Sequence, residues 1–214
     1  MAVTEVGAKG VRQMVILATI AALTPAFAQS LRFTCDEQGV FPPSLTAEQL
    51  ERRFGKENVT AGDVDLGEGE KERGTILFPA SKNDQVSITW KEKDHQRRPA
   101  SVRLLIEGTA QSRWRGPLGV STQVRLKDLE AFNRRPFRIF GFGWDYSGSV
   151  ASWADGLLDQ LANSPCRFIV RMNPEEGADI ALQNTVMGDR EYSSGHPSMQ
   201  RLNPKAYEFL LVYP

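Results

Sequence analysis

Apolar positions near the start of the chain repeat with the spacing of a helix. Leu50 and Phe54 fall four residues apart, as on one helical face. The flanking residues fit this interpretation, because Thr46 and Gln49 have the spacing of a capping box and Gly55 supplies a left-handed stop. The pattern therefore predicts a first helix between Thr46 and Gly55.

Short segments rich in β-branched and aromatic residues follow this helix, with turn-rich polar stretches between them. They predict an antiparallel meander of three strands, at residues 75–78, 86–90 and 102–106. The same order then repeats. Leu126, Leu129 and Phe132 mark a second helix that residues 133–136 end. Four more strands are predicted after it, at residues 137–146, 150–153, 167–172 and 207–213.

This repeated order predicts an α+β fold with two helix-plus-antiparallel-sheet units packed as one compact domain. The first unit spans residues 45–110, and the second spans residues 111–214 with a C-terminal strand. Leu50 and Leu129 take equivalent places in the two units. The period is long and the identity low, so a chance likeness between two ordinary α+β segments is the alternative.

The N-terminal segment has the order of a secretory signal peptide. Two cations precede an apolar run over residues 14–23, and the small residues Ala26 and Ala28 follow it. This predicts a signal peptide over residues 1–28, a mature chain that begins at Gln29, and a periplasmic or secreted location. An uncleaved run would be a membrane anchor, but it is shorter than the roughly 20 residues that span a bilayer. We expect no stable membrane insertion after cleavage.

The sequence has two cysteines, Cys35 and Cys166. In an oxidising compartment an even count favours one disulfide, which would pin a proline-containing N-terminal arm at residues 29–44. A redox or nucleophilic cysteine is the alternative. It has little support, because there is no Cys-x-x-Cys and neither cysteine has a histidine close in sequence.

Charge excludes one class of partner. The chain has 26 basic and 26 acidic residues, interleaved along its length, so we expect no nucleic-acid binding.

Residue types for catalysis are few. His196 has Ser193, Ser194 and Ser198 around it and Asp189 nearby, the residue types of a nucleophilic triad. Residues this close along one loop seldom meet in triad geometry, and no Gly-x-Ser-x-Gly elbow is present. The adjacent carboxylates at residues 175–176 would point apart on a surface turn. No recurrent spacing of metal ligands is present. We expect no catalytic residue, metal or cofactor.

Four aromatic residues at spacing two form the strongest candidate for binding. In a strand, Phe140, Phe142, Trp144 and Tyr146 would project from one face of the sheet. We expect Phe140 and Phe142 to pack in the core. Trp144, Asp145 and Tyr146 combine rigid apolar rings with polar groups, as interface hot spots do, and are the candidate partner-binding residues.

Six segments carry a resemblance to a known family: LTAEQLERRFG (residues 45–55), SRWR (112–115), LKDLEAFNRRPF (126–137), FGFGWDYSG (140–148), GDREYSS (188–194) and LNPK (202–205). They resemble a family of uncharacterised exported proteobacterial proteins. The resemblance covers most of the mature chain. It implies that the protein is located in a bacterial periplasm, but it does not imply a particular activity.

A second resemblance concerns the fold. The motif T-x-x-x-L-x-x-x-F-G at residues 46–55 is similar to the helix motif of outer-membrane-assembly lipoproteins and of tandem-repeat β-lactamase inhibitor proteins. Both place short helices on an antiparallel sheet and bind other proteins. The second unit departs from the motif, with Asn133 and Arg134 where glycine is expected, although asparagine tolerates the left-handed conformation. The resemblance implies a non-catalytic interaction protein that binds an envelope or enzyme partner. The alternatives are a small hydrolase of envelope polymers and a binder of an apolar or glycan ligand.

Overall fold

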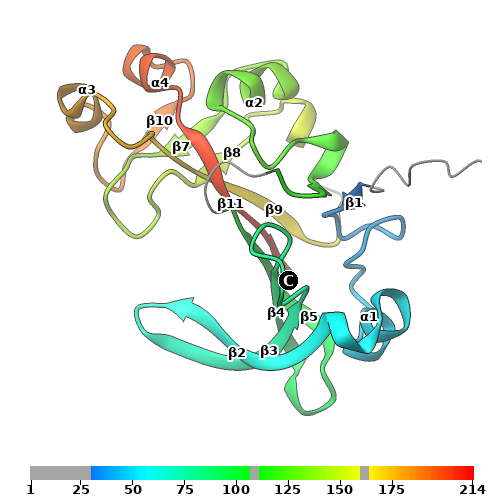
Figure 1. Cartoon of the computed structure of the whole chain (residues 1–214). Coiled ribbons are helices and arrows are strands. Elements are labelled where there is room, and N and C mark those ends of the chain that lie inside the picture. The colour runs from blue at the N-terminus through cyan, green and yellow to red at the C-terminus, as the bar shows by residue number, and fades with distance from the viewer. Residues whose placement is uncertain (1–29, 107–110, 160–163) are drawn as a thin grey trace, which may run out of the picture.

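A computed structural model describes residues 30–106, 111–159 and 164–214, so the predicted signal peptide lies outside the described residues. The fold is α+β, as predicted, and a six-stranded antiparallel sheet forms its centre (Figure 1). In spatial order its strands are β2 (Val59–Gly67), β3 (Glu70–Leu77), β4 (Val86–Glu92), β5 (Arg97–Leu105), β11 (Lys205–Val212) and β9 (Arg167–Asn173).

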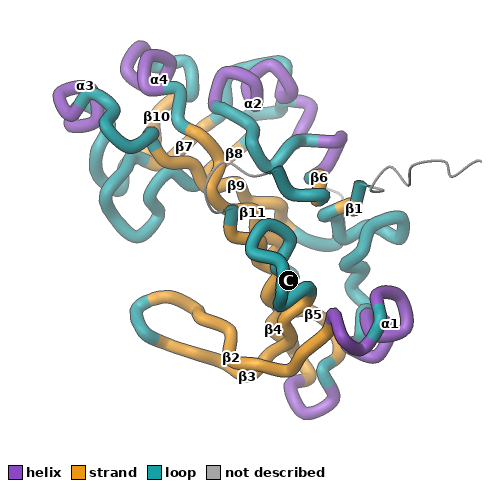
Figure 2. The backbone as a smooth tube through the Cα atoms, in the orientation of Figure 1, coloured by secondary structure: helices purple, strands orange, loops and turns teal. Residues whose placement is uncertain are grey.

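A second antiparallel sheet and several short helices lie outside this central sheet (Figure 2). The second sheet has the order β10 (Glu191–Ser193), β7 (Arg138–Phe140) and β8 (Val150–Ser152), and a parallel pair joins β1 (Leu31–Arg32) to β6 (Trp114–Arg115). The helices are α1 (Ala47–Phe54), α2 (Leu126–Asn133), α3 (Ile180–Asn184) and α4 (Pro197–Leu202), with 3₁₀ turns at η1 (Lys56–Asn58), η2 (Lys93–His95) and η3 (Pro117–Gly119). Within the described ranges, no helix is long and apolar enough to cross a membrane.

Helix α1 begins and ends where its sequence predicts. The Thr46 hydroxyl accepts a hydrogen bond from the Gln49 N–H, and the Gln49 side chain accepts one from the Thr46 N–H at 2.8 Å. This capping box satisfies donors that the first turn leaves without helical partners. Gly55 ends the helix with a φ of +88°. Leu50 points inward and is buried, which holds the helix against the core.

The last strand joins the two predicted units in one sheet. β11 lies between β5 and β9, so strands from both units form a continuous six-stranded ladder. The predicted strands at 75–78, 86–90, 102–106, 167–172 and 207–213 all overlap strands of this sheet. Within this sheet, β2 is the strand that the pattern did not predict, because only Val59 and Val64 are buried along its nine residues.

The predicted strand at residues 137–146 is wrong beyond its first part. β7 ends at Phe140, and the chain then crosses residues 186–188, where Phe142 exchanges main-chain hydrogen bonds with Val186 and Gly188. At Gly141 a Cβ atom would lie 2.5 Å from the Gly188 carbonyl oxygen, so the crossing requires glycine. The four aromatic residues therefore do not share one face of a strand.

Helix α2 ends differently from the sequence expectation. Arg134, and not Asn133, adopts the left-handed conformation, with a φ of +62°. Asn133 remains helical and is fully buried. Its side chain donates to the carbonyl oxygens of Arg135 and Trp153 and accepts from the Leu158 N–H. The asparagine thus connects α2 to the segment after β8.

The N-terminal arm contributes to the core instead of only lying over it. The Phe33 ring packs edge-on to the Phe41 ring at 5.3 Å and contacts Trp114 at 5.9 Å. All three rings are buried. Burial of such side chains stabilises a fold by up to about 3 kcal/mol each. The predicted disulfide between Cys35 and Cys166 is present and ties this arm to the start of β9.

Candidate partner-binding site

The candidate binding residues lie in a tight loop between β7 and β8, which we call the aromatic loop (residues 143–148). Trp144 is 61% exposed and Tyr146 is 57% exposed, and Asp145 between them is exposed as well. The loop projects on the same side of the molecule as α3 (Figures 1 and 2). The structure therefore places all three predicted residues together at the surface.

Main-chain hydrogen bonds fix the shape of this loop. The Ser147 and Ser149 N–H groups donate to the carbonyl oxygens of Trp144 and Tyr146, both at 2.8 Å. The Ser147 hydroxyl accepts from the Gly143 N–H at 3.0 Å. None of these bonds depends on the side chains at positions 144 to 146. The loop consequently presents its aromatic side chains on an ordered backbone.

Gly148 anchors the loop to the central sheet. Its N–H donates to the Gly141 carbonyl oxygen, and its own carbonyl oxygen accepts from the Met172 N–H on β9 at 2.9 Å. The φ of Gly148 is +62°, and a Cβ atom there would lie 1.8 Å from the Met172 carbonyl oxygen. Only glycine fits both the conformation and the space.

The two aromatic rings differ in their surroundings. The Tyr146 ring stacks on the half-buried Phe140 ring, with centroids 5.1 Å apart. The Trp144 side chain has no ring or hydrogen-bond partner within the described residues. Met187, itself 42% exposed, brings its methyl group to the neighbouring Gly143. Trp144, Tyr146 and Met187 are thus exposed apolar side chains on or next to the loop that carries Asp145.

His196 and Ser194, two of the residues with the types of a nucleophilic triad, each have a structural role. His196 Nδ1 accepts from the Ser198 N–H at 3.2 Å and so caps α4, while its ring packs edge-on against Tyr192. Ser194 is fully buried; its hydroxyl accepts from the Phe137 N–H and donates to the Glu130 carboxylate. Ser194 lies in the turn between β10 and α4, and its buried hydroxyl is bonded to Glu130 on α2 and not to His196.

Other candidates for chemistry also have structural roles. Glu175 forms an ion pair with Arg125, and Glu176 is exposed. Among the described residues, no group of three or more histidine, cysteine, aspartate or glutamate side chains could hold a metal ion.

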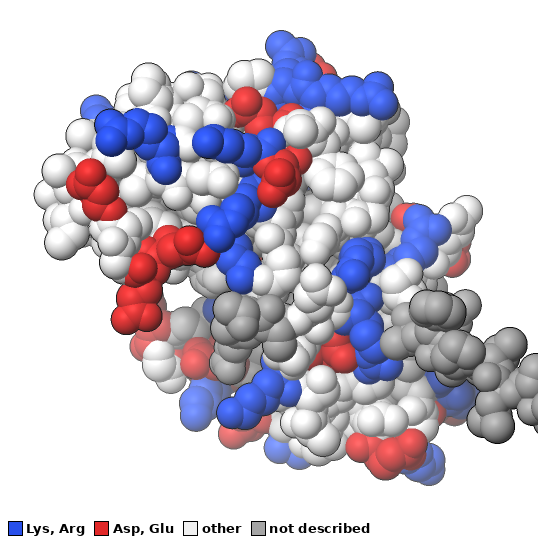
Figure 3. Space-filling model, turned by 45° about the horizontal axis from the view of Figure 1, so that its top comes forward, with Lys and Arg blue, Asp and Glu red and all other residues white. Residues whose placement is uncertain are grey.

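Lysine, arginine, aspartate and glutamate side chains are interspersed on the face in Figure 3. That distribution gives this face no continuous basic surface.

The sequence pattern did not indicate a buried charge in the central sheet. Glu208 on β11 is only 2% exposed and lies between Arg103 on β5 and Arg171 on β9. Its Oε2 atom is 3.6 Å from Arg171 Nε. One carboxylate thus compensates two guanidinium groups across three adjacent strands. The sequence feature that could have indicated this cluster is a charged residue between apolar neighbours in the last strand.

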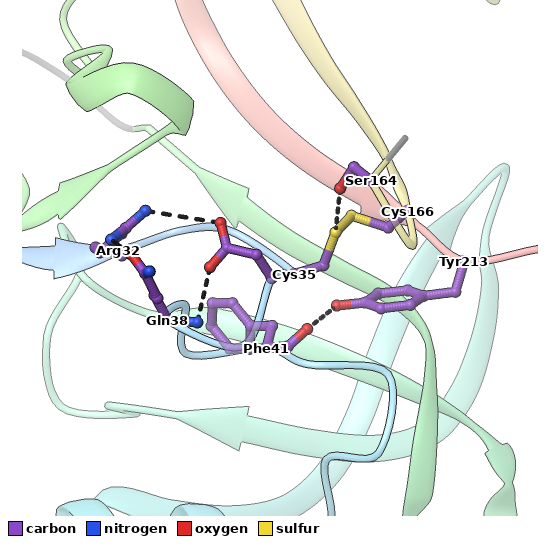
Figure 4. The surroundings of a disulfide bond; sticks show 8 residues. Arg32, Cys35, Gln38, Phe41, Ser164, Cys166 and Tyr213 are labelled. Atoms are coloured by element: carbon purple, nitrogen blue, oxygen red, sulfur yellow. Dashed lines mark hydrogen bonds and ion pairs between the residues drawn. A yellow bond between two sulfur atoms is a disulfide. The ribbon is translucent and has the colours of Figure 1, made fainter. Parts of the chain in front are cut away.

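The disulfide lies next to a second feature of interest. Figure 4 shows Cys35 joined to Cys166, with the Ser164 hydroxyl 2.9 Å from the Cys35 sulfur. The hydroxyl of Tyr213, at the C-terminal end of β11, donates to the Phe41 carbonyl oxygen. Burial raises the pKa of Tyr213, so it remains protonated and keeps this hydrogen bond. A cavity of about 590 Å³ borders Cys166 and Tyr213.

Compared with known protein families, curated proteins and solved structures, the chain matches none. The function must therefore be inferred from the geometry of these sites.

Proposed function

We propose that the protein is an exported, non-catalytic interaction protein of the bacterial periplasm, which binds an envelope protein or an enzyme through its aromatic loop. The observation that carries the proposal is the exposure of Trp144 and Tyr146 on a backbone that main-chain hydrogen bonds hold in place. A loop whose backbone is already ordered loses less conformational freedom on binding than a flexible one. Tryptophan and tyrosine are also the side chains most often responsible for affinity at interfaces.

The disulfide supports the location part of the proposal. Disulfides persist in oxidising compartments such as the periplasm and are rare in the bacterial cytosol. His196 caps α4, and Ser194 is hydrogen-bonded to Glu130. Their geometry therefore gives no support to the alternative of a hydrolase. A binding role requires no such constellation.

The test is capture of a partner from periplasm by crosslinking, with matched variants. The double variant Trp144→Ala and Tyr146→Ala should reduce capture by about tenfold or more, as expected when interface hot spots are removed. Phe132→Ala is the control, because Phe132 is also exposed, at 40%, but lies on α2. It should leave capture unchanged. Thermal melting of each variant must show an intact fold.

Two results would contradict the proposal. In the first, the double variant folds and captures the same proteins as the unaltered chain. In the second, Phe132→Ala and the double variant lose capture equally, which would mean that the crosslinked proteins recognise exposed apolar side chains in general. Identification of the captured protein by mass spectrometry then decides between an envelope protein and an enzyme.

A further inference from the structure

The cavity beside the disulfide arises because two strands meet at one end and then separate. Ser149 and Arg171 form an isolated antiparallel bridge, and the Met172 N–H donates to the Gly148 carbonyl oxygen next to it. From this point β8 continues in the three-stranded sheet and β9 in the six-stranded sheet. The cavity of about 590 Å³ is lined by residues in and next to both strands, 150–153 and 166–169, by residues 158, 159 and 164, and by the C-terminal residues 212–214.

Several walls of this cavity are held in place by contacts between described residues. Cys166 is held by its disulfide to Cys35, and Tyr213 by its hydrogen bond to the Phe41 carbonyl oxygen (Figure 4). The rings of Trp153 and Phe168 lie nearly parallel, with centroids 6.4 Å apart. Trp153 also packs against Phe137 in the core, at 5.5 Å. Such walls cannot close over the space without breaking these contacts. The volume lies within the roughly 300–1,000 Å³ typical of small-molecule sites.

The lining is mainly apolar, and most of its polar side chains already have partners. Ser152 Oγ accepts from the Ala154 N–H, and Ser164 Oγ contacts the Cys35 sulfur. The Asp159 carboxylate accepts from the Asp155 N–H at 2.7 Å. These contacts leave few side chains to hydrogen-bond a ligand with many hydroxyl groups, such as a glycan.

Arg167 is the exception. It lines the cavity, it is exposed, and it forms no ion pair or side-chain hydrogen bond with the described residues, Asp159 included. A guanidinium is always charged and recognises carboxylates and related acids by paired hydrogen bonds. The cavity thus combines apolar walls with one available cation.

We propose that this cavity binds a small amphipathic acid. Its apolar or aromatic body packs between Trp153, Phe168 and the C-terminal residues, and its acidic group pairs with Arg167. The site is separate from the aromatic loop, so failure of this proposal would not affect the proposed partner binding, and the reverse also holds.

Two fluorescent probes test the proposal on the protein with its disulfide intact. The first is 1-anilinonaphthalene-8-sulfonate, an aromatic acid, and the second is N-phenyl-1-naphthylamine, which has the same rings without the acid. Both should bind saturably, and dodecanoate should displace them. Arg167→Gln should weaken the sulfonate by about fivefold or more and change the uncharged probe by less than about twofold. Arg201→Gln, an exposed arginine on α4, is the control and should change neither probe.

A second variant tests the space itself. Ala151 lines the cavity, so Ala151→Phe should fill it and weaken both probes by about tenfold or more. Ala61→Phe is the control, because Ala61 is an exposed position on β2. Circular dichroism and thermal melting must show that each variant is folded. If Ala151→Phe does not fold, the contrast between the two probes in Arg167→Gln decides alone.

Several results would overturn the proposal: no saturable binding of either probe, unchanged affinities in a folded Ala151→Phe variant, or an equal effect of Arg167→Gln on both probes. Displacement of the probes by an oligosaccharide but not by dodecanoate would also overturn it.

Discussion

Replacement of Asn133 by alanine should destabilise the protein strongly, because this one side chain satisfies three main-chain groups. Asn133 is fully buried at the C-terminal end of α2. Its Nδ2 donates to the carbonyl oxygens of Arg135 at 3.0 Å and Trp153 at 2.8 Å, and its Oδ1 accepts from the Leu158 N–H at 3.1 Å. Alanine offers none of these bonds.

The size of the effect follows from the groups left without partners. A buried donor or acceptor that loses its only partner costs about 1–3 kcal/mol. Gly156 packs closely against the amide, since a Cβ atom on it would lie 2.1 Å from Asn133 Oδ1. We therefore expect Asn133→Ala to lower the free energy of unfolding by about 3–5 kcal/mol. Asn133→Asp, which loses the donor and buries a charge, should lose at least as much at neutral pH.

Urea denaturation, monitored by tryptophan fluorescence, measures the free energy of unfolding of both variants. Asn58→Ala is the matched control, since the Asn58 side chain is half-buried and donates to a single main-chain carbonyl, that of Phe54 at 2.8 Å. Its expected cost is about 0.5–1.5 kcal/mol. Equal losses in Asn133→Ala and Asn58→Ala, within about 0.5 kcal/mol, would refute the argument that burial of the three bonds sets the magnitude.

Two further perturbations test other contacts. Reduction of the Cys35–Cys166 bond should lower the free energy of unfolding by about 4 kcal/mol, because the bond joins residues 131 positions apart; equal urea midpoints with and without reductant would contradict this. Burial acts to raise the pKa of Asp84, but hydrogen bonds from the Arg113 main chain and guanidinium and from Ser112 outweigh it, so the folded-state pKa is lowered. Asp84 therefore stabilises the fold above its unfolded pKa of about 3.9, and this contribution is lost as pH falls through the lower folded value. Between about pH 5 and pH 2.5, the Asp84→Asn variant should therefore lose less stability than the unaltered protein. If urea unfolding shows the same dependence on pH for both, Asp84 contributes nothing.

Features decided by neighbouring residues were predictable from the sequence. The capping box of Thr46 and Gln49 involves residues three apart, and two cysteines leave one intramolecular pairing. Features decided by distant parts of the chain were not. β7 ends because residues 186–188 cross at Gly141, and Asn133 is helical because the segment after β8 supplies its partners. Neither contact can be predicted from the local pattern of apolar residues.

The same distinction separates fold from function at the aromatic loop. The hydrogen bonds that shape it come from main-chain groups and the Ser147 hydroxyl, so the fold does not require a tryptophan at position 144. Tyr146 has a partial structural reason, its stacking on Phe140. Trp144 has no such contact within the described residues, so no ring contact or side-chain hydrogen bond there gives a structural reason for a tryptophan. Loss of capture in Trp144→Ala without loss of stability is therefore a cleaner indication of partner binding than the same loss in Tyr146→Ala.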